Sequence, residues 1–240
     1  MNASSDLSLF LGTTDALSER TDLLCADDLE RLQAMASPRR RAQFCAGRAL
    51  LRLALGHLRA APAQPWPFVL EDGRPVLPDP QAPQLSLSHS GNHVACAIGH
   101  AGRCGVDLQI DTGRSNRGIA DTFFAPADVD WLQRQADATR AFRELWVLKE
   151  AWAKASGKAL IHVLQHVRFA PADPAPRHWQ AGTTPLSPAL SLGWAVDRPC
   201  APPALLAWRA DGFAPMAATF TRWQRIDAPP ATMPNGQVDP

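Results

Sequence analysis

The sequence predicts an α+β fold composed of two similar halves in one chain. A helical pattern followed by several short strand patterns occurs in each half, although the halves share no residue-level repeat. The hydrophobic fraction of 46% over 240 residues is large enough for a core that needs neither disulfides nor metals. We expect an N-terminal half at residues 1–112, a C-terminal half at residues 113–226, and a disordered tail at residues 227–240, which contain four prolines.

In the first half, residues 37–60 predict a long helix. Ser37 is a suitable N-cap, and Pro38 fits the first helical turn. Apolar side chains recur at helical spacing, namely Phe44, Leu51, Leu55 and Leu58. A second line on this helix consists of Arg41, Arg48, Arg52 and Arg59. Arginines in one line can bind phosphates or form a solvated basic face, and from the spacing both interpretations stay open.

The remaining elements follow in order. The apolar runs around Asp72-Gly73 indicate a hairpin over residues 68–77. Strands are then expected at residues 84–90, 93–98 and 104–108. After the Gly/Asn/Arg-rich residues 111–118, helices are expected at residues 127–135 and 139–156, the second ending at Gly157. Further strands are expected at residues 160–169, 189–196, 205–208 and 217–223.

Composition excludes several classes of protein. With 24 Lys+Arg against 23 Asp+Glu, the net charge of +1 argues against a nucleic-acid-binding protein, including one that uses the arginine-rich helix. No apolar segment approaches 18 residues, so we expect no membrane span, and the N-terminus lacks the basic leader of a signal peptide. The five cysteines have no CxxC spacing and indicate neither disulfides nor a thiolate zinc site. We expect a cytoplasmic protein.

The helix at residues 139–156 carries all three lysines of the chain on it or just after it, namely Lys149, Lys154 and Lys158. At about 100° per residue, Arg143, Trp146 and Lys154 lie within about 40° of Glu150. The opposite, core-facing side carries Ala141, Leu145, Leu148 and Trp152. Glu150 and Lys154 could form an ordinary surface ion pair or part of a site.

Two other segments place polar side chains together. Asp107 and Gln109 lie on one side of the strand at residues 104–108 and just after it, and carboxylates suit Mg²⁺. Ser88 and His89 end the strand at residues 84–90, where no acid is spaced to complete a nucleophilic triad. His162 and His166 are four residues apart but lie in a strand-like run, so we expect no zinc there.

In chain order these pieces resemble the motifs of the 4′-phosphopantetheinyl transferase superfamily, in its long, surfactin-synthetase-activating branch. The two signature motifs stand here as Gly105-Val106-Asp107 and Trp146-x-x-Lys149-Glu150-Ala151-x-x-Lys154. Two supporting motifs stand as Gly73-Arg74-Pro75 and Ser88-His89-Ser90-Gly91. The resemblance implies two α+β halves with the active cleft between them.

The resemblance also implies an activity. Such enzymes use Mg²⁺ to transfer the 4′-phosphopantetheine group of coenzyme A to a serine of an apo acyl or peptidyl carrier protein, releasing adenosine 3′,5′-bisphosphate. The carriers belong to fatty-acid, polyketide or nonribosomal-peptide biosynthesis. A monomer is expected because both halves lie in one chain. The alternative is a non-catalytic module of the same fold that binds coenzyme A or a carrier protein.

The family's site residues carry over onto matching positions. Asp107 and Glu150 would hold Mg²⁺, Glu150 would be the base for the carrier serine, and Lys154 would contact the pyrophosphate. Further coenzyme contacts would come from Arg41, Arg48, Arg74, Ser88 and His89. Many members of this branch have a glutamate where this chain has Gln109, whose amide oxygen could still be a metal ligand but lacks the charge. We therefore expect a site with two carboxylates, Gln109 being ancillary.

Overall fold

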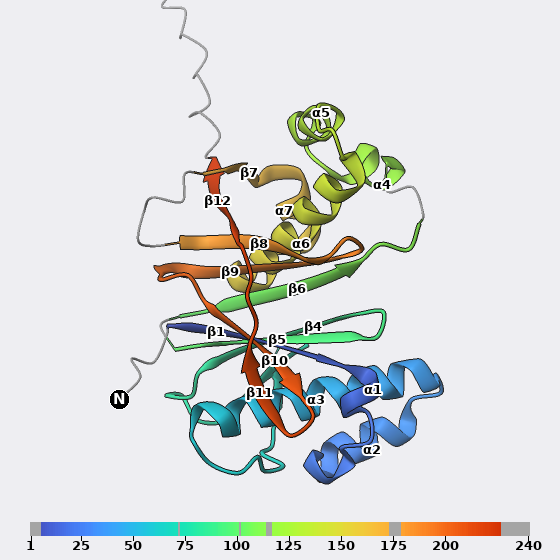
Figure 1. Cartoon of the computed structure of the whole chain (residues 1–240), viewed down its shortest axis with the longest axis vertical. Helices are drawn as coiled ribbons and strands as arrows, with labels where there is room; N and C mark the ends of the chain where they lie inside the picture. Colours follow the sequence, from blue (N-terminus) through green and yellow to red (C-terminus); the bar gives the residue numbers. More distant parts are fainter. Residues whose placement is uncertain (1–5, 72, 101, 114–116, 173–178, 227–240) are drawn as a thin grey trace, which may run out of the picture.

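Two five-stranded sheets pack against each other between two long helices in the computed structural model (Figure 1). The structure describes residues 6–71, 73–100, 102–113, 117–172 and 179–226. Each half thus consists of one sheet with one long helix on its outer face, and this arrangement confirms the α+β fold with two similar halves. The predicted tail at residues 227–240 lies outside the described residues.

The first sheet has the strand order β11-β10-β1-β5-β4. Its strands are β1 (Leu7–Thr13), β4 (Gln84–Ser90), β5 (His93–Gly99), β10 (Ala204–Arg209) and β11 (Gly212–Pro215). Only β1 and β10 run parallel; the other neighbours are antiparallel. The outer face is covered by α3 (Pro38–Leu58), which begins as predicted, with Ser37 Oγ accepting a hydrogen bond from the Arg40 amide.

Shorter elements surround this sheet. The chain reaches α3 through α1 (Thr14–Leu17), a 3₁₀ turn (Thr21–Leu23) and α2 (Ala26–Ala34). The predicted hairpin is confirmed as β2 (Val69–Glu71) and β3 (Arg74–Val76). Gly73 between them has φ 77°, a conformation that glycine adopts without strain. Asp72, the other predicted turn residue, lies outside the described residues.

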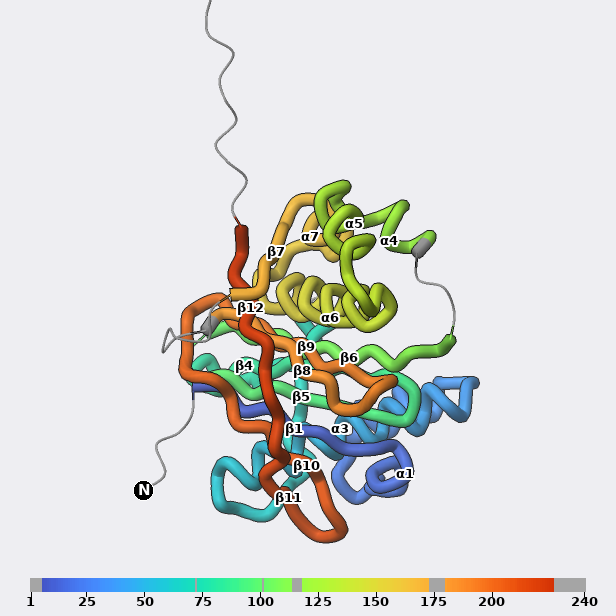
Figure 2. The backbone as a smooth tube through the Cα atoms, turned by 45° about the horizontal axis from the view of Figure 1, so that its top comes forward, coloured from blue at the N-terminus to red at the C-terminus, as the bar shows by residue number. Residues whose placement is uncertain are grey.

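The second sheet has the order β6-β9-β8-β12-β7. Its strands are β6 (Cys104–Ile110), β7 (Arg168–Pro171), β8 (Trp179–Ser187), β9 (Leu190–Cys200) and β12 (Thr221–Ile226). Its outer face is covered by α6 (Ala138–Ser156), which lies across β6 and β9 (Figure 2). Asp137 caps the start of α6 and Gly157, at φ 70°, ends it as predicted. Three short helices pack nearby, α4 (Arg117–Phe123), α5 (Pro126–Gln133) and α7 (Leu160–His166).

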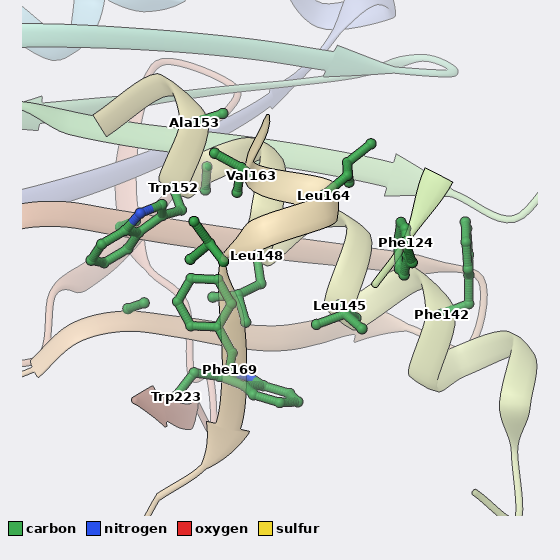
Figure 3. Close-up of a cluster of buried hydrophobic side chains, with 14 of the residues drawn as sticks. Phe124, Phe142, Leu145, Leu148, Trp152, Ala153, Val163, Leu164, Phe169 and Trp223 are labelled. Carbon is green, nitrogen blue, oxygen red and sulfur yellow. The ribbon is translucent and has the colours of Figure 1, made fainter. Parts of the chain in front are cut away.

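The prediction of a strand over residues 160–169 is wrong. The segment is the helix α7, followed by β7. Val163 and Leu164 are buried against α6, as Figure 3 shows, so its apolar residues follow a helical rather than an alternating pattern. The expected strand at residues 217–223 begins only at Thr221. The strands β1 and β8 were not predicted.

The two sheets meet along the edge strands β4 and β6 through serine side chains. Ser86, Ser88 and Ser90 each accept a hydrogen bond on Oγ from a backbone amide of β6, at 2.9 to 3.1 Å. Because strand side chains alternate, every second residue of β4 points toward β6. These hydroxyls accept the hydrogen bonds of β6 amides that have no strand partner on that side of the sheet.

The sheets do not divide at residue 112, where we placed the boundary between halves. The strand β6 precedes that point but pairs with β9 of the second sheet. Conversely, β10 and β11 come late in the chain but belong to the first sheet. A boundary drawn at one residue cannot separate the two sheets, because the chain crosses between them three times, before β6, before β10 and before β12.

Among the described residues, no helix has both the length and the apolar character needed to span a bilayer. The five cysteines are free thiols, four of them buried, which agrees with the expectation of no disulfide framework.

Candidate active site

The face of β6 that bears Gly105, Asp107 and Gln109 lies under α6, while its other face lines the core between the sheets. The absence of a side chain at Gly105 permits this close approach, since a Cβ atom there would lie against the carbonyl oxygen of Ala151. Gly105, the first residue of the Gly-Val-Asp motif, therefore lets α6 pack close to Asp107, its third residue. Glu150 and Lys154 are brought to Asp107 in this way.

Asp107 is the centre of the site, and its side chain is almost fully buried. Its Oδ1 accepts hydrogen bonds from Ser88 Oγ and Lys154 Nζ, both at 2.8 Å. Lys154 Nζ also donates to the carbonyl oxygen of Val106 at 2.9 Å. Buried carboxylate oxygens need hydrogen-bond partners, and Asp107 obtains them from both halves of the molecule.

Glu150 lies beside this pair, with Oε2 3.9 Å from Lys154 Nζ. Burial and, after it, the neighbouring Asp107 carboxylate raise the pKa of the Glu150 carboxyl to about 7, while Lys154 opposes the rise. Two carboxylates that crowd one site with insufficient positive charge are the arrangement that a divalent cation stabilises.

Gln109 lines the same small cleft of about 280 Å³ as Asp107, Glu150 and Lys154. Its Nε2 donates to the carbonyl oxygen of Ile110 at 3.2 Å, so its amide is oriented by its own strand. Among the described residues no group of three His, Cys, Asp or Glu side chains could hold a metal. The donor set of two carboxylates and one amide oxygen nevertheless fits Mg²⁺, which takes few protein ligands and keeps several waters.

A larger basic cleft of about 570 Å³ adjoins this site. It shares His89 and Lys154 with the small cleft and extends between α2, α3 and the β2–β3 hairpin. Its basic lining residues are Arg31, Arg40, Arg48, Arg74, His89 and Lys154. No acidic residue lines it among those described, so the cleft suits a polyanionic ligand.

The arginine line on α3 is neither a solvated face nor a simple row of phosphate ligands. Arg48 and Arg52 are buried and share the carboxylate of Asp28, at 3.1 and 2.6 Å. Arg52 also donates two hydrogen bonds to the carbonyl oxygen of Trp66. The side of α3 that carries them packs against α2 and the residues before β2, which the sequence spacing did not reveal.

Arg48 still reaches the basic cleft. Its side chain is 95% buried, yet among the described residues its Nη1 has no hydrogen-bond partner. A buried guanidinium nitrogen that lines a cleft without a partner is a suitable donor to an anionic ligand.

The other predicted coenzyme contacts lie in different surroundings. Arg74 lines the basic cleft and donates to the carbonyl oxygen of Cys104 at 2.9 Å, and His89 lines both clefts. Ser88 is buried and bound to Asp107. Arg41 donates to the carbonyl oxygen of Leu32 at 2.7 Å and, among the described residues, is not one of those that line the basic cleft.

Sequence reasoning missed two arginines of the basic cleft, Arg31 and Arg40. Arg40 adjoins Arg41 on the correctly predicted helix, but at about 100° per residue Arg41 lies about 20° and Arg40 about 80° from Arg48, so the helical spacing favours Arg41 and gives no signal for Arg40. Arg31 lies on α2, for which no helix was predicted.

The polar side of α6 is also less exposed than its wheel suggested. Arg143 is buried and is bound to Asp111 and Ser191. Trp146 stacks on Phe124 and Phe142, with ring centroids 6.2 and 5.8 Å apart. Only Glu150 and Lys154 of the four aligned side chains face the clefts.

Comparison with known proteins agrees with this site. The model of the 4′-phosphopantetheinyl transferase superfamily matches residues 103–192, which contain both signature motifs. The model of the 4′-phosphopantetheinyl transferase N-terminal domain matches residues 28–99, which supply most of the basic cleft. Together the two matches span most of the described chain.

Named relatives point to the same family. The protein slr0495 of Synechocystis sp., which bears the family name, is 29% identical over 68% of this chain and 73% of its own length. The 4′-phosphopantetheinyl transferase AcpT of Salmonella typhimurium is 31% identical over 49% of this chain and 60% of its own. The 4′-phosphopantetheinyl transferase Sfp of Bacillus subtilis is 35% identical over 38% of this chain and 40% of its own. With its motifs in order on two similar halves, the chain is an enzyme of the 4′-phosphopantetheinyl transferase superfamily, in the long branch to which Sfp belongs.

Proposed function

We propose that this chain transfers the 4′-phosphopantetheine group of coenzyme A to a serine of an apo carrier protein, releasing adenosine 3′,5′-bisphosphate. The observation that carries the proposal is the contact of Asp107, Lys154 and Glu150 at the end of a cleft lined by six basic residues. Catalysis of phosphoryl transfer consists mainly of positioning and charge stabilisation, and this arrangement supplies both.

The basic cleft binds the phosphates of coenzyme A. Its volume of about 570 Å³ is in the range of small-molecule sites. Arg48 offers an Nη1 without a partner among the described residues, Arg74 lines the basic cleft, and His89 lines both this cleft and the small cleft that holds the acids. We assign Arg31 and Arg40 to the same role because they line the cleft. Arg41 and Ser88 remain predicted contacts, with Ser88 also holding Asp107.

Asp107 and Glu150 hold Mg²⁺, with the Gln109 amide beside it. When bound, the metal neutralises charge on the pyrophosphate of coenzyme A. Lys154 holds the Asp107 carboxylate by a hydrogen bond and directs a compact positive charge toward the pyrophosphate.

Glu150 is the general base. The serine oxygen of the carrier attacks the phosphorus next to the pantetheine arm, the bond to the bridging oxygen breaks, and the bisphosphate leaves. The serine proton passes to Glu150, directly or through a water molecule. A cation held beside Glu150 favours its ionised form, which is the form that accepts the proton.

The partner is an acyl or peptidyl carrier protein of fatty-acid, polyketide or nonribosomal-peptide biosynthesis, and we propose that the enzyme acts as a monomer in the cytoplasm. The alternative is a non-catalytic module that binds coenzyme A or a carrier, suggested by Gln109 in place of an acid. The two carboxylates and Lys154 in contact favour the enzyme, because binding alone does not require them.

The test is to incubate the protein with coenzyme A, Mg²⁺ and several unrelated apo carrier proteins and to measure the mass of each carrier. Gain of the phosphopantetheine mass on at least one carrier is expected. Binding of coenzyme A with no gain on any carrier would favour the binding module instead.

Two variants test the residue roles. Glu150→Gln and Asp107→Asn are each expected to abolish transfer while the variant remains folded by circular dichroism. Full activity of the double variant would refute this assignment of the site. Arg48→Ala is expected to raise the KM for coenzyme A strongly, and Arg41→Ala to raise it less, because Arg41 is not among the described residues that line the basic cleft.

A further inference from the structure

A second glycine lies beneath α6, outside every motif considered so far. Gly193 is in the middle of β9, and a Cβ atom on it would lie 2.6 Å from the carbonyl carbon and oxygen of Val147 and 2.9 Å from the nitrogen of Leu148. All three are backbone atoms, so no side-chain rotation relieves the overlap. Gly193 is not among the residues with positive φ. The position therefore requires the absence of a side chain, not the conformational freedom of glycine.

Gly193 also adjoins the centre of the candidate site. It is the direct partner of Asp107 in the pairing of β9 with β6. On α6, the residue above Gly193 is Val147 and the residue above Gly105 is Ala151, one turn later. Glu150 lies between these two contact points in the sequence. The contacts of α6 with the two glycines thus flank the place where Glu150 and Lys154 meet Asp107.

We propose that Gly193 is a positioning residue, which lets α6 lie close enough to β6 and β9 for Glu150 and Lys154 to reach Asp107. The proposal rests on the proposed function of those three residues. Gly193 touches neither coenzyme nor carrier and acts only through the distance between the helix and the sheet.

The tolerance of the site is small. Ordinary van der Waals contact begins near 3.4 Å, so a methyl group at Gly193 must move α6 away by about 1 Å. The hydrogen bond from Lys154 Nζ to Asp107 Oδ1 is 2.8 Å long and would not survive such a displacement at full strength. The two carboxylates that hold the metal would separate by a similar amount.

The experiment compares Gly193→Ala with a matched variant, Gly182→Ala. Gly182 lies on β8 of the same sheet, and a Cβ atom there would meet Trp194 Nε1 at 2.7 Å, on the face away from α6. The same substitution with a similar overlap thus disturbs the sheet without acting on α6. For both variants and the wild type we measure folding by circular dichroism, kcat, the KM for coenzyme A and the Mg²⁺ concentration at half-maximal rate.

Gly193→Ala is expected to raise the half-saturating Mg²⁺ concentration by about 10- to 100-fold and to lower kcat by about 100-fold. The KM for coenzyme A should change little, because the basic cleft belongs mainly to the other half. Gly182→Ala is expected to lose stability but to keep the Mg²⁺ dependence of the wild type. A folded Gly193→Ala variant with wild-type kcat and Mg²⁺ dependence would overturn the proposal, as would equal changes in both variants.

Two further measurements keep the outcome interpretable. If Gly193→Ala does not fold, Ala195→Ser adds a single atom at the next residue of β9 on the same face, and an unaltered Mg²⁺ dependence in it would count against the proposal. Mg²⁺-induced stabilisation against heat, measured without coenzyme or carrier, is expected to weaken in Gly193→Ala but not in Gly182→Ala. A wild-type protein that transfers nothing but is stabilised by Mg²⁺ would contradict the proposed function. The role of Gly193 would then be decided by the thermal stabilisation alone: a weaker effect of Mg²⁺ in Gly193→Ala would support it, and an equal effect would refute it.

Discussion

The carboxyl group of Glu150 couples the stability of the fold to pH. Its pKa in the folded protein is about 7, above its ordinary value of 4.5, so the folded state binds this proton more tightly than the unfolded chain does. In metal-free buffer the contribution of Glu150 to stability should therefore be lost as the pH rises from about 4.5 through about 7. Denaturant unfolding across this range is expected to show wild-type protein losing stability relative to Glu150→Gln. Parallel pH profiles for the two proteins would contradict the assignment.

Gln109 offers a second test at the scale of single residues. A carboxylate at this position would add negative charge to the cleft that Asp107 and Glu150 line. We expect Gln109→Glu to lower the Mg²⁺ concentration at half-maximal transfer rate, and Gln109→Ala to raise it only slightly. An unaltered Mg²⁺ dependence in Gln109→Glu would exclude a direct role in metal binding.

At the scale of elements, Lys149 fixes α6 to its neighbouring helices. It is fully buried, its Nζ lies 2.7 Å from Asp128 Oδ2 on α5, and it donates to the carbonyl oxygens of Val163, Leu164 and Val167 at the end of α7. Thus one lysine of the signature motif holds three helices together, while Glu150, about 100° further around α6, lines the small cleft with Asp107.

Breaking this ion pair from one side leaves a buried charge without its main partner. Lys149→Met is expected to lower the free energy of unfolding by about 3–5 kcal/mol, because Asp128 then stays buried and, among the described residues, keeps only the more distant Arg168 as an ion-pair partner, at 3.8 Å. The double variant Lys149→Met/Asp128→Leu should recover much of this loss. Denaturant unfolding checks both, and a double variant less stable than either single variant would argue against the explanation.

Local signals in the sequence located most elements correctly. Ser37-Pro38 and Gly157 mark helix ends through their own backbone preferences, and the Asp-Gly turn of the hairpin needs no distant partner. By contrast, α7 depends on burial of Val163 and Leu164 against α6 and on Lys149 binding its carbonyls. The spacing of Leu160, Val163, Leu164 and Val167 is nevertheless helical, so the segment did carry a local signal for α7, which the prediction of a strand did not use.

The residues of the candidate site likewise fall into two groups: those that local sequence spacing predicts and those whose role depends on tertiary contacts. Asp107, Glu150 and Lys154 were found because the spacing in two motifs fixes them. The environment of Arg48 could not be inferred, because its carboxylate partner, Asp28, lies on an unpredicted helix. The role of Arg31 in the cleft could not be inferred either, because Arg31 lies on the same helix, α2.

At the scale of the whole molecule, the two halves are joined because strands from late in the chain belong to the first sheet. The first sheet is completed by β10 and β11, which come after the helices α4 to α7 in the chain. Because β10 pairs with β1 on the side opposite β5, its removal would expose the backbone of a buried central strand.

A chain that ends at residue 203 is therefore expected to be insoluble or unfolded, although it retains every residue assigned to the candidate site. Circular dichroism and size-exclusion chromatography of the truncated protein check this expectation. A soluble, folded product that transfers phosphopantetheine would show that β10, β11 and β12, all of which the truncation removes, are dispensable.

The parallel pairing of β1 with β10 also has a consequence for biosynthesis. The partner of Leu9 on one side is Ala97, but on the other side it is Leu205. At ribosomal rates of about 5–20 residues per second, the interval between synthesis of these two partners is about 5–20 s. During that time β1 can pair with β5, but its other edge has no partner because β10 has not yet been synthesised. The protein is therefore expected to be most prone to aggregation while it is still being synthesised, where neighbouring nascent chains lie close together.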